Sequence, residues 1–195
     1  MSNNPVIRFT IKDLGTMTAE LYPNMAPRTV ANFLHLIREG FFEGLIFHRV
    51  IRGFMIQGGG YTEAFEDTDA PSIPGEFKAN GYMNNTLKHT RGVLSMARTS
   101  DPNSASSQFF IMHANAAYLD GQYAAFGKVI EGDAIIDQIA NVETGNYGWY
   151  MQDVPMTPCG DRKHRNCGRI SRFRKALKYN LENHNIKIGK MYDSN

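Results

Sequence analysis

Short strand-like segments outnumber helical ones in this chain, and this pattern most constrains the fold. Runs rich in β-branched and aromatic residues recur from Val6 to Ile130, separated by turn residues. Within residues 1–155 only two segments have apolar residues at helical spacing. A doubly wound parallel sheet would need a helix in nearly every crossover, so the pattern favours an antiparallel barrel or sandwich. The pattern does not distinguish between these two.

The predicted elements begin with a hairpin around Asp13. A first helix is predicted between Pro27 and Gly40, because apolar residues recur there every three or four positions. Proline is favoured at the first position of a helix, and Gly40 marks its end. Residues 58–90 are rich in Gly, Pro, Asp and Asn and are predicted to form mostly loop. Strands are predicted at 6–11, 16–21, 47–57 (a pair), 92–97, 108–112 and 124–130, and a second helix at 133–140.

Residues 47–59, with the sequence FHRVIRGFMIQGG, carry the strongest functional signal. Strand alternation places Arg49 on the same face as Phe47 and Ile51, and so directs it among hydrophobic side chains. A turn and a return strand would bring the ring, thioether and amide of residues 54–57 close to the guanidinium. The result would be an apolar pocket beneath a multi-donor cation. The alternative is a surface arginine whose alkyl stem covers apolar neighbours.

Later motifs occur in a fixed order, and with residues 47–59 they resemble the cyclophilins, a family of peptidyl-prolyl cis-trans isomerases. The resemblance covers residues 5–155 and implies a mainly β fold: a closed eight-stranded antiparallel β-barrel capped by two α-helices, with the substrate groove on its outer surface. The later motifs are GVLSMAR at 92–98, SSQFFI at 106–111, YLDG at 118–121 and FGKV at 126–129.

The resemblance also implies a set of site residues. The amide of Gln57 is expected to bond both the peptide backbone and Arg49. No cofactor and no metal are expected. The implied catalytic residues are Arg49, Phe54 and Gln57, and the implied substrate-binding residues are Met55, Ala97, Arg98, Thr99, Gln108, Phe110, Tyr118, Leu119 and Tyr123.

Rotation about an X-Pro bond must break amide resonance, and the barrier is about 18 to 20 kcal/mol. Twisting localises the lone pair on the prolyl nitrogen. A donor aimed at that nitrogen therefore stabilises the twisted transition state more than either planar state. Arg49 is the candidate donor because its charge is permanent.

Several positions depart from the family's best-known pattern. Tyr118 stands where a tryptophan is usual, and since cyclosporin engages that indole in the family, weak cyclosporin binding is expected. Tyr123 replaces a histidine, and Arg98 occupies a position usually held by asparagine, where the family uses the main chain. An acidic lip that favours basic peptides is expected from Glu63, Glu66, Asp67 and Asp69.

Two other signals are discounted. The spacing of Cys159, His164 and Cys167 matches no common zinc module. His48 lies beside Arg49, but isomerisation transfers no proton, so His48 is expected to pack rather than act as a base.

The chain changes character after the position of Pro155. Residues 1–150 hold 11 basic and 15 acidic residues, whereas 151–195 hold 10 basic and 4 acidic. The sequence thus predicts an isomerase domain at 1–155 and a basic extension at 156–195. In the extension, 170–183 has the spacing of an amphipathic helix, and 185–191 alternates like a strand that closes the barrel. An altered reading frame near residue 159 would also explain the change.

Two cysteines, no apolar leader and no membrane-length segment predict a soluble cytoplasmic protein. We expect a monomer whose partners are proline-containing peptides and unfolded or folding proteins. The leading hypothesis is a peptidyl-prolyl isomerase. The alternative is a non-catalytic module that binds proline peptides, and a nucleic-acid tether formed by the basic extension is a lesser hypothesis.

Overall fold

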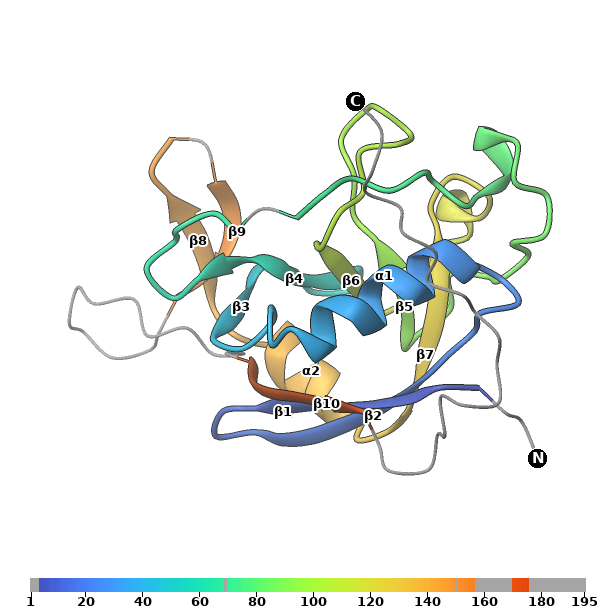
Figure 1. The fold of residues 1–195 in the computed structure, drawn as a ribbon. Helices are drawn as coiled ribbons and strands as arrows, with labels where there is room; N and C mark the ends of the chain where they lie inside the picture. The colour runs from blue at the N-terminus through green and yellow to red at the C-terminus, as the bar shows by residue number, and fades with distance from the viewer. Residues whose placement is uncertain (1–3, 69, 150, 157–169, 176–195) are drawn as a thin grey trace.

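The structure is built on a strongly curled antiparallel sheet (Figure 1). The computed structural model describes residues 4–68, 70–149, 151–156 and 170–175. Within these residues the eight strands lie in the order β10-β1-β2-β7-β5-β6-β4-β3. They are β1 (Val6–Ile11), β2 (Gly15–Leu21), β3 (Leu45–Ile51), β4 (Met55–Thr62), β5 (Val93–Met96), β6 (Phe109–Met112), β7 (Ala125–Glu131) and β10 (Ile170–Lys175).

Two α-helices accompany the sheet in the described residues: α1 (Pro27–Arg38), which lies near β10, and α2 (Ala134–Ala140), which lies near β2, β3 and β4. A separate hairpin, β8 (Thr144–Tyr147) and β9 (Met151–Pro155), was not among the predicted elements. The predicted mainly β fold, with eight sheet strands and two α-helices, is confirmed.

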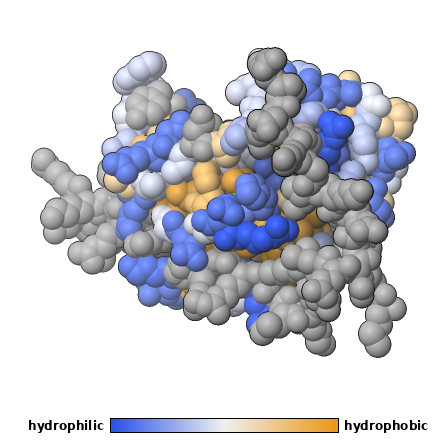
Figure 2. Space-filling model, in the orientation of Figure 1, coloured by the Kyte–Doolittle hydropathy of each residue, from blue (hydrophilic) through white to orange (hydrophobic). Residues whose placement is uncertain are grey.

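On the face seen in Figure 1, hydrophilic side chains surround a smaller hydrophobic area near the middle (Figure 2).

The curled sheet has a seam between β3 and β10. In the part of the chain that the structure describes, these two edge strands form no continuous ladder. One backbone hydrogen bond crosses between them, from the N–H of Gly44 to the carbonyl of Ile170 (2.9 Å). The sheet is therefore open at this seam in the described residues, whereas the prediction was a closed barrel.

The predicted helix at 170–183 is wrong over its first six residues, because 170–175 form strand β10 (Figure 1). This strand pairs with β1, from Ile11 opposite Ile170 to Ile7 opposite Lys175. Without it, β1 would present a row of unpaired N–H and C=O groups. Ile170 is also buried in the main core. Pairing and burial outweigh the helical spacing; 176–183 and 185–191 lie outside the described residues.

The glycine-rich end of β4 was predicted as loop but is strand as far as Thr62. Gly58, Gly59 and Gly60 are buried there. A Cβ at Gly59 would stand 2.7 Å from the carbonyl oxygen of Ser107, and its φ is +87°. These glycines permit close packing of neighbouring backbone, so their composition does not mark a loop.

The strands separate two apolar clusters. On β6, Phe109 and Ile111 point into the main core, whereas Phe110 and Met112 belong to a second cluster. Phe33 of α1 packs edge-on against Phe109, with ring centroids 5.2 Å apart. The second cluster therefore lies on the other face of the strands, outside the barrel.

Helix α1 depends on a carboxylate from a distant part of the chain. Its N-cap residue, Ala26, provides no side-chain acceptor. Instead Glu76, which is buried, accepts hydrogen bonds from the backbone N–H of Arg28 (3.0 Å) and of Thr29 (2.8 Å), and from the hydroxyl of Thr29 (2.7 Å). Its position at the helix N-terminus is also electrostatically favourable.

Glu76→Gln is therefore expected to lower the free energy of unfolding by about 2 kcal/mol, because the amide keeps one acceptor oxygen and turns an N–H₂ toward the helix donors. Urea unfolding measures the change. The matched control is Glu66→Gln, whose side chain is exposed and whose expected effect is close to zero. Equal stabilities for the two variants would contradict this account of the cap.

Candidate active site

A pocket of about 210 Å³ opens on the outer face of the sheet, over the second apolar cluster. It brings together residues from β3, β4, β6, the segment after β5 and the short turn Ala117–Leu119. Each lining residue is one that the sequence analysis assigned to the site. They are Arg49, Phe54, Met55, Gln57, Ala97, Arg98, Phe110, Leu119 and Tyr123.

The floor of the pocket is apolar and mostly buried. Met55, Phe110 and Leu119 are all less than a tenth exposed. The ring of Phe110 meets that of Tyr123 edge-on, with centroids 5.9 Å apart. The Phe110 ring also stacks on that of His89, with centroids 6.1 Å apart. Neighbouring rings therefore restrain the floor, which is suited to a small apolar ring such as pyrrolidine.

His89 is a supporting residue that the sequence analysis missed. Its Nε2 lies 3.0 Å from the hydroxyl of Ser95, and its Nδ1 lies 3.1 Å from Asp120, which also accepts the backbone N–H of His89. Burial lowers the pKa of His89, although Asp120 opposes this. The imidazole is therefore neutral near pH 7. The YLDG motif, which contains Asp120, was the available signal.

The prediction that Arg49 shares a face with Phe47 is wrong. The β3–β4 register pairs Phe47 with Gly58 but Arg49 with Gln57, so β3 carries one extra residue here. Such a β-bulge interrupts the alternation of side chains. As a result Phe47 is buried in the main core, and Arg49 lies at the pocket with 44% of its side chain exposed.

Arg49 has an acidic neighbour from the unpredicted hairpin. Its Nε lies 3.7 Å from Oδ2 of Asp153 on β9. Asp153 adopts a positive φ of 58°. No motif in the sequence indicated this contact, because it depends on how the β8–β9 hairpin folds back toward β3.

Gln57 makes a different contact from the predicted one. Its amide donates to the side-chain oxygen of Gln108 (3.1 Å), and among the described residues the structure records no hydrogen bond between Gln57 and Arg49. Gln108 borders a neighbouring hollow that Arg49 also lines, together with His48, Tyr61, Met151 and Gln152. The two amides therefore form a polar strip beside the guanidinium.

Arg98 is held more firmly than the sequence suggested. Its guanidinium lies over the ring of Tyr123 (4.5 Å to the centroid) and near that of Phe77 (5.0 Å). It also donates to the carbonyls of Thr99 (2.8 Å) and Gln122 (2.9 Å). These contacts make the side chain part of the pocket wall.

Two further predicted residues, like Gln108, are not among those that line the pocket. Tyr118 is 70% exposed and stacks on Phe54, with ring centroids 6.0 Å apart. Thr99 bonds to Ser104 through both its N–H (2.9 Å) and its hydroxyl (2.8 Å). Glu63, Glu66 and Asp67 follow β4 but do not line the pocket, and Asp69 is outside the described residues.

His48 is buried next to Arg49 and packs edge-on against Tyr61, with ring centroids 4.7 Å apart. Burial, and then the charge of Arg49, lowers the pKa of His48 to about 4. The ring is therefore neutral near pH 7 and does not line the pocket.

In the described part of the chain, no group of three or more His, Cys, Asp and Glu side chains is arranged to hold a metal ion. Cys159, His164 and Cys167 lie outside the described residues. The described helices include none that is long and apolar enough to cross a membrane.

Comparisons with known proteins agree with the fold. Residues 6–161 match the family described as cyclophilin type peptidyl-prolyl cis-trans isomerase/CLD. A peptidyl-prolyl cis-trans isomerase of Acinetobacter baylyi is 48% identical over 152 residues, which are 75% of this chain and 77% of that protein. Peptidyl-prolyl cis-trans isomerase B of Escherichia coli is 43% identical over 149 residues, 72% of this chain and 87% of its own length.

A solved structure shares the architecture. It is a cyclophilin type peptidyl-prolyl cis-trans isomerase of Cryptosporidium parvum, determined in the presence of the dipeptide ala-pro. Its TM-score is 0.64 at 27% sequence identity, and the match covers 88% of this chain and 98% of that one.

Proposed function

This chain belongs to the cyclophilin family of peptidyl-prolyl cis-trans isomerases, and from that premise we propose that X-Pro bonds are isomerised in the pocket beneath Arg49. The observation that carries this proposal is the position of Arg49 at an apolar pocket that Phe54, Phe110 and Leu119 also line. A relative was solved in the presence of ala-pro, which supports proline as the occupant.

Arg49 acts on the amide nitrogen rather than on a proton or an anion. Asp153 approaches its Nε, so the two terminal nitrogens remain for a bound peptide as far as the described residues are concerned. A donor directed at the prolyl nitrogen strengthens as the amide twists and its lone pair localises. A rate gain of about 10⁵ requires the barrier to fall by about 7 kcal/mol, which this interaction supplies together with desolvation and positioning.

The remaining groups hold the peptide while one side of the bond rotates. The floor binds the pyrrolidine ring, and the amides of Gln57 and Gln108 bind the peptide backbone beside it. The N–H of Ala97 already donates to the carbonyl of Gln108 (2.9 Å), so a bond from Ala97 to a peptide would use its carbonyl oxygen. The reaction as proposed uses no metal and no cofactor.

The test is cis-trans exchange in a short X-Pro peptide, followed by NMR with and without the protein. The expected result is faster exchange together with shifts of the Phe54 and Phe110 ring resonances. Faster exchange with peptide-induced shifts confined to another surface would place the activity elsewhere. Binding without faster exchange would support a non-catalytic module.

We propose that physiological substrates are proline-containing segments of unfolded or folding proteins. We also propose that the protein is a monomer and that it is located in the cytoplasm. The low cysteine content supports the cytoplasm as the compartment. The division into 1–155 and a basic extension also stays a proposal. The pairing of β10 with β1 supports the view that the extension completes the sheet of the isomerase domain.

Tyr118→Trp is expected to tighten cyclosporin binding about threefold to tenfold. The reason is that the indole N–H donates from a different position on the ring than the tyrosine hydroxyl does. Tyr118 is exposed beside Phe54, so the larger ring has room. Calorimetric titration of wild type and variant measures the difference, with Tyr118→Phe as the control that adds no donor. Equal affinities for Trp and Phe variants would exclude the indole as the cause.

A further inference from the structure

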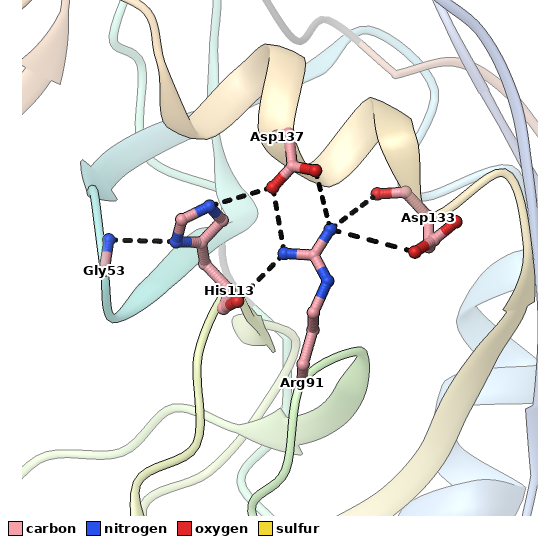
Figure 3. Close-up of polar contacts among 5 residues, drawn as sticks. All are labelled: Gly53, Arg91, His113, Asp133 and Asp137. Atoms are coloured by element: carbon pink, nitrogen blue, oxygen red, sulfur yellow. Dashed lines mark hydrogen bonds and ion pairs between the residues drawn. The ribbon is translucent and has the colours of Figure 1, made fainter.

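The turn between β3 and β4 joins two pocket residues, Arg49 before it and Phe54 after it. The N–H of Phe54 donates to the carbonyl of Ile51 (3.0 Å), and Gly53 has a φ of +79°. The position of Phe54 therefore depends on how firmly the backbone of this turn is fixed by its contacts. Figure 3 shows that a polar cluster from three other parts of the chain reaches this turn.

His113, directly after β6, contacts the turn twice. Its backbone N–H donates to the carbonyl of Phe54 (2.9 Å), and its ring Nδ1 lies 2.9 Å from the backbone nitrogen of Gly53 (Figure 3). A backbone N–H can only donate, so Nδ1 must be the acceptor. The contact therefore requires a neutral ring that carries its proton on Nε2.

The other ring nitrogen meets an acid that suits this tautomer. Nε2 of His113 lies 3.0 Å from Oδ1 of Asp137 on α2 and donates to it. Asp137 is bound by both terminal nitrogens of Arg91, each at 2.9 Å. The hydrogen bond from Arg91 lowers the pKa of Asp137, so the carboxylate stays charged and available as an acceptor.

Arg91 ties the cluster to the rest of the fold. It donates to the carbonyl of His113 (2.9 Å) and to that of Asp133 (3.2 Å), and it lies 3.8 Å from the Asp133 carboxylate. Its backbone N–H donates to Asn115 (2.9 Å). The chain of contacts thus runs from α2 and the start of β5 to the backbone of the turn.

We propose that His113 is a positioning residue for the isomerase: the Arg91–Asp137–His113 relay fixes the turn at Gly53 and so holds Phe54 at the pocket. This inference rests on the proposed role of the pocket. His113 does not itself line the pocket, so it acts through the turn.

The contact between His113 and Gly53 requires that Nδ1 carry no proton. The charged groups around the ring are Asp137, Arg91 and, through Arg91, Asp133. A second proton on His113 would lie on Nδ1 and oppose the N–H of Gly53, so the turn contact would be lost.

Three variants separate positioning from bulk stability. In His113→Asn the amide oxygen can take the place of Nδ1 and keep the bond from Gly53, whereas in His113→Gln the amide nitrogen can take the place of Nε2 and keep only the bond to Asp137. His113→Ala loses both. Because the Asn and Gln variants each lose one hydrogen bond, their unfolding free energies should be similar.

The measurement is kcat/KM for an X-Pro peptide by NMR exchange, with urea unfolding of each variant. We expect His113→Gln and His113→Ala to fall about threefold to tenfold while His113→Asn stays within about twofold of wild type. Equal losses in the Asn and Gln variants, or no loss in either, would overturn the positioning role.

Arg49→Ala in the same assay keeps the two proposals apart. A large loss in Arg49→Ala with a flat His113 series refutes the relay and leaves the pocket proposal standing. No loss in Arg49→Ala refutes the proposed role of Arg49 itself, whatever the His113 variants do.

Discussion

Arg49→Ala is expected to lower kcat/KM about 10²-fold to 10³-fold, the usual effect of removing one preorganised donor from a transition state. The loss should appear mainly in kcat, since the hydrogen bond to the prolyl nitrogen strengthens only as the amide twists. NMR exchange of an X-Pro peptide at several concentrations separates kcat from KM. The fold should persist, because Arg49 and its partner Asp153 are both substantially exposed.

Two further variants make the Arg49 experiment specific. Arg49→Lys keeps a positive charge but loses the planar set of donors, so it should recover only part of the activity. Arg52→Ala is the matched control, because Arg52 is an exposed arginine in the same turn that does not line the pocket. If Arg49→Ala were as active as Arg52→Ala, the guanidinium would have no part in the reaction.

Acid is expected to destabilise the folded protein through His48. Its pKa in the folded state is about 4, against 6.5 ordinarily, so between these values the unfolded chain binds the proton and the folded protein does not. The contribution of a neutral His48 is complete above pH 6.5 and is lost as the pH falls toward 4. The difference amounts to about 3 kcal/mol of unfolding free energy.

Urea unfolding at a series of pH values measures this dependence. His48→Phe keeps an aromatic ring against Tyr61 but cannot titrate, so its stability should depend less on pH over this range by about the same 3 kcal/mol. His35→Phe is the control, since His35 is exposed on α1. His89, whose pKa burial also lowers, contributes in the same direction and remains in both variants. Parallel curves for wild type and His48→Phe would show that His48 is not the buried titrating group.

Most elements could be predicted from local pattern. The strands of the β1–β2 hairpin and helix α1 follow from alternation and from helical spacing between Pro27 and Gly40. The sequence did not reveal the end of β4, because buried glycines there permit close backbone packing while their composition resembles a loop. It also misassigned 170–175, where the unpaired edge of β1 outweighs the helical spacing.

Nine of the twelve site residues that the family resemblance implies line one pocket, because they lie in or beside the motifs that carry the resemblance. The exact positions and contacts of these side chains could not be predicted from the sequence. The bulge before Arg49 is a property of the β3–β4 pairing, and the guanidinium of Arg98 lies between two rings that are distant in the sequence. Such details depend on register and on long-range contacts, which no local pattern specifies.

The sequence by itself therefore determined the family, most of the strand and helix segments of the first 140 residues, and the chemical types at the pocket. These follow from motifs and from periodicity, which are local. Tertiary structure alone decided that a bulge separates Arg49 from the face of Phe47, that Asp153 lies near Arg49, and that His113 contacts the neighbouring turn. Each of these depends on residues far apart in the chain, which approach only when the sheet curls and the core is buried.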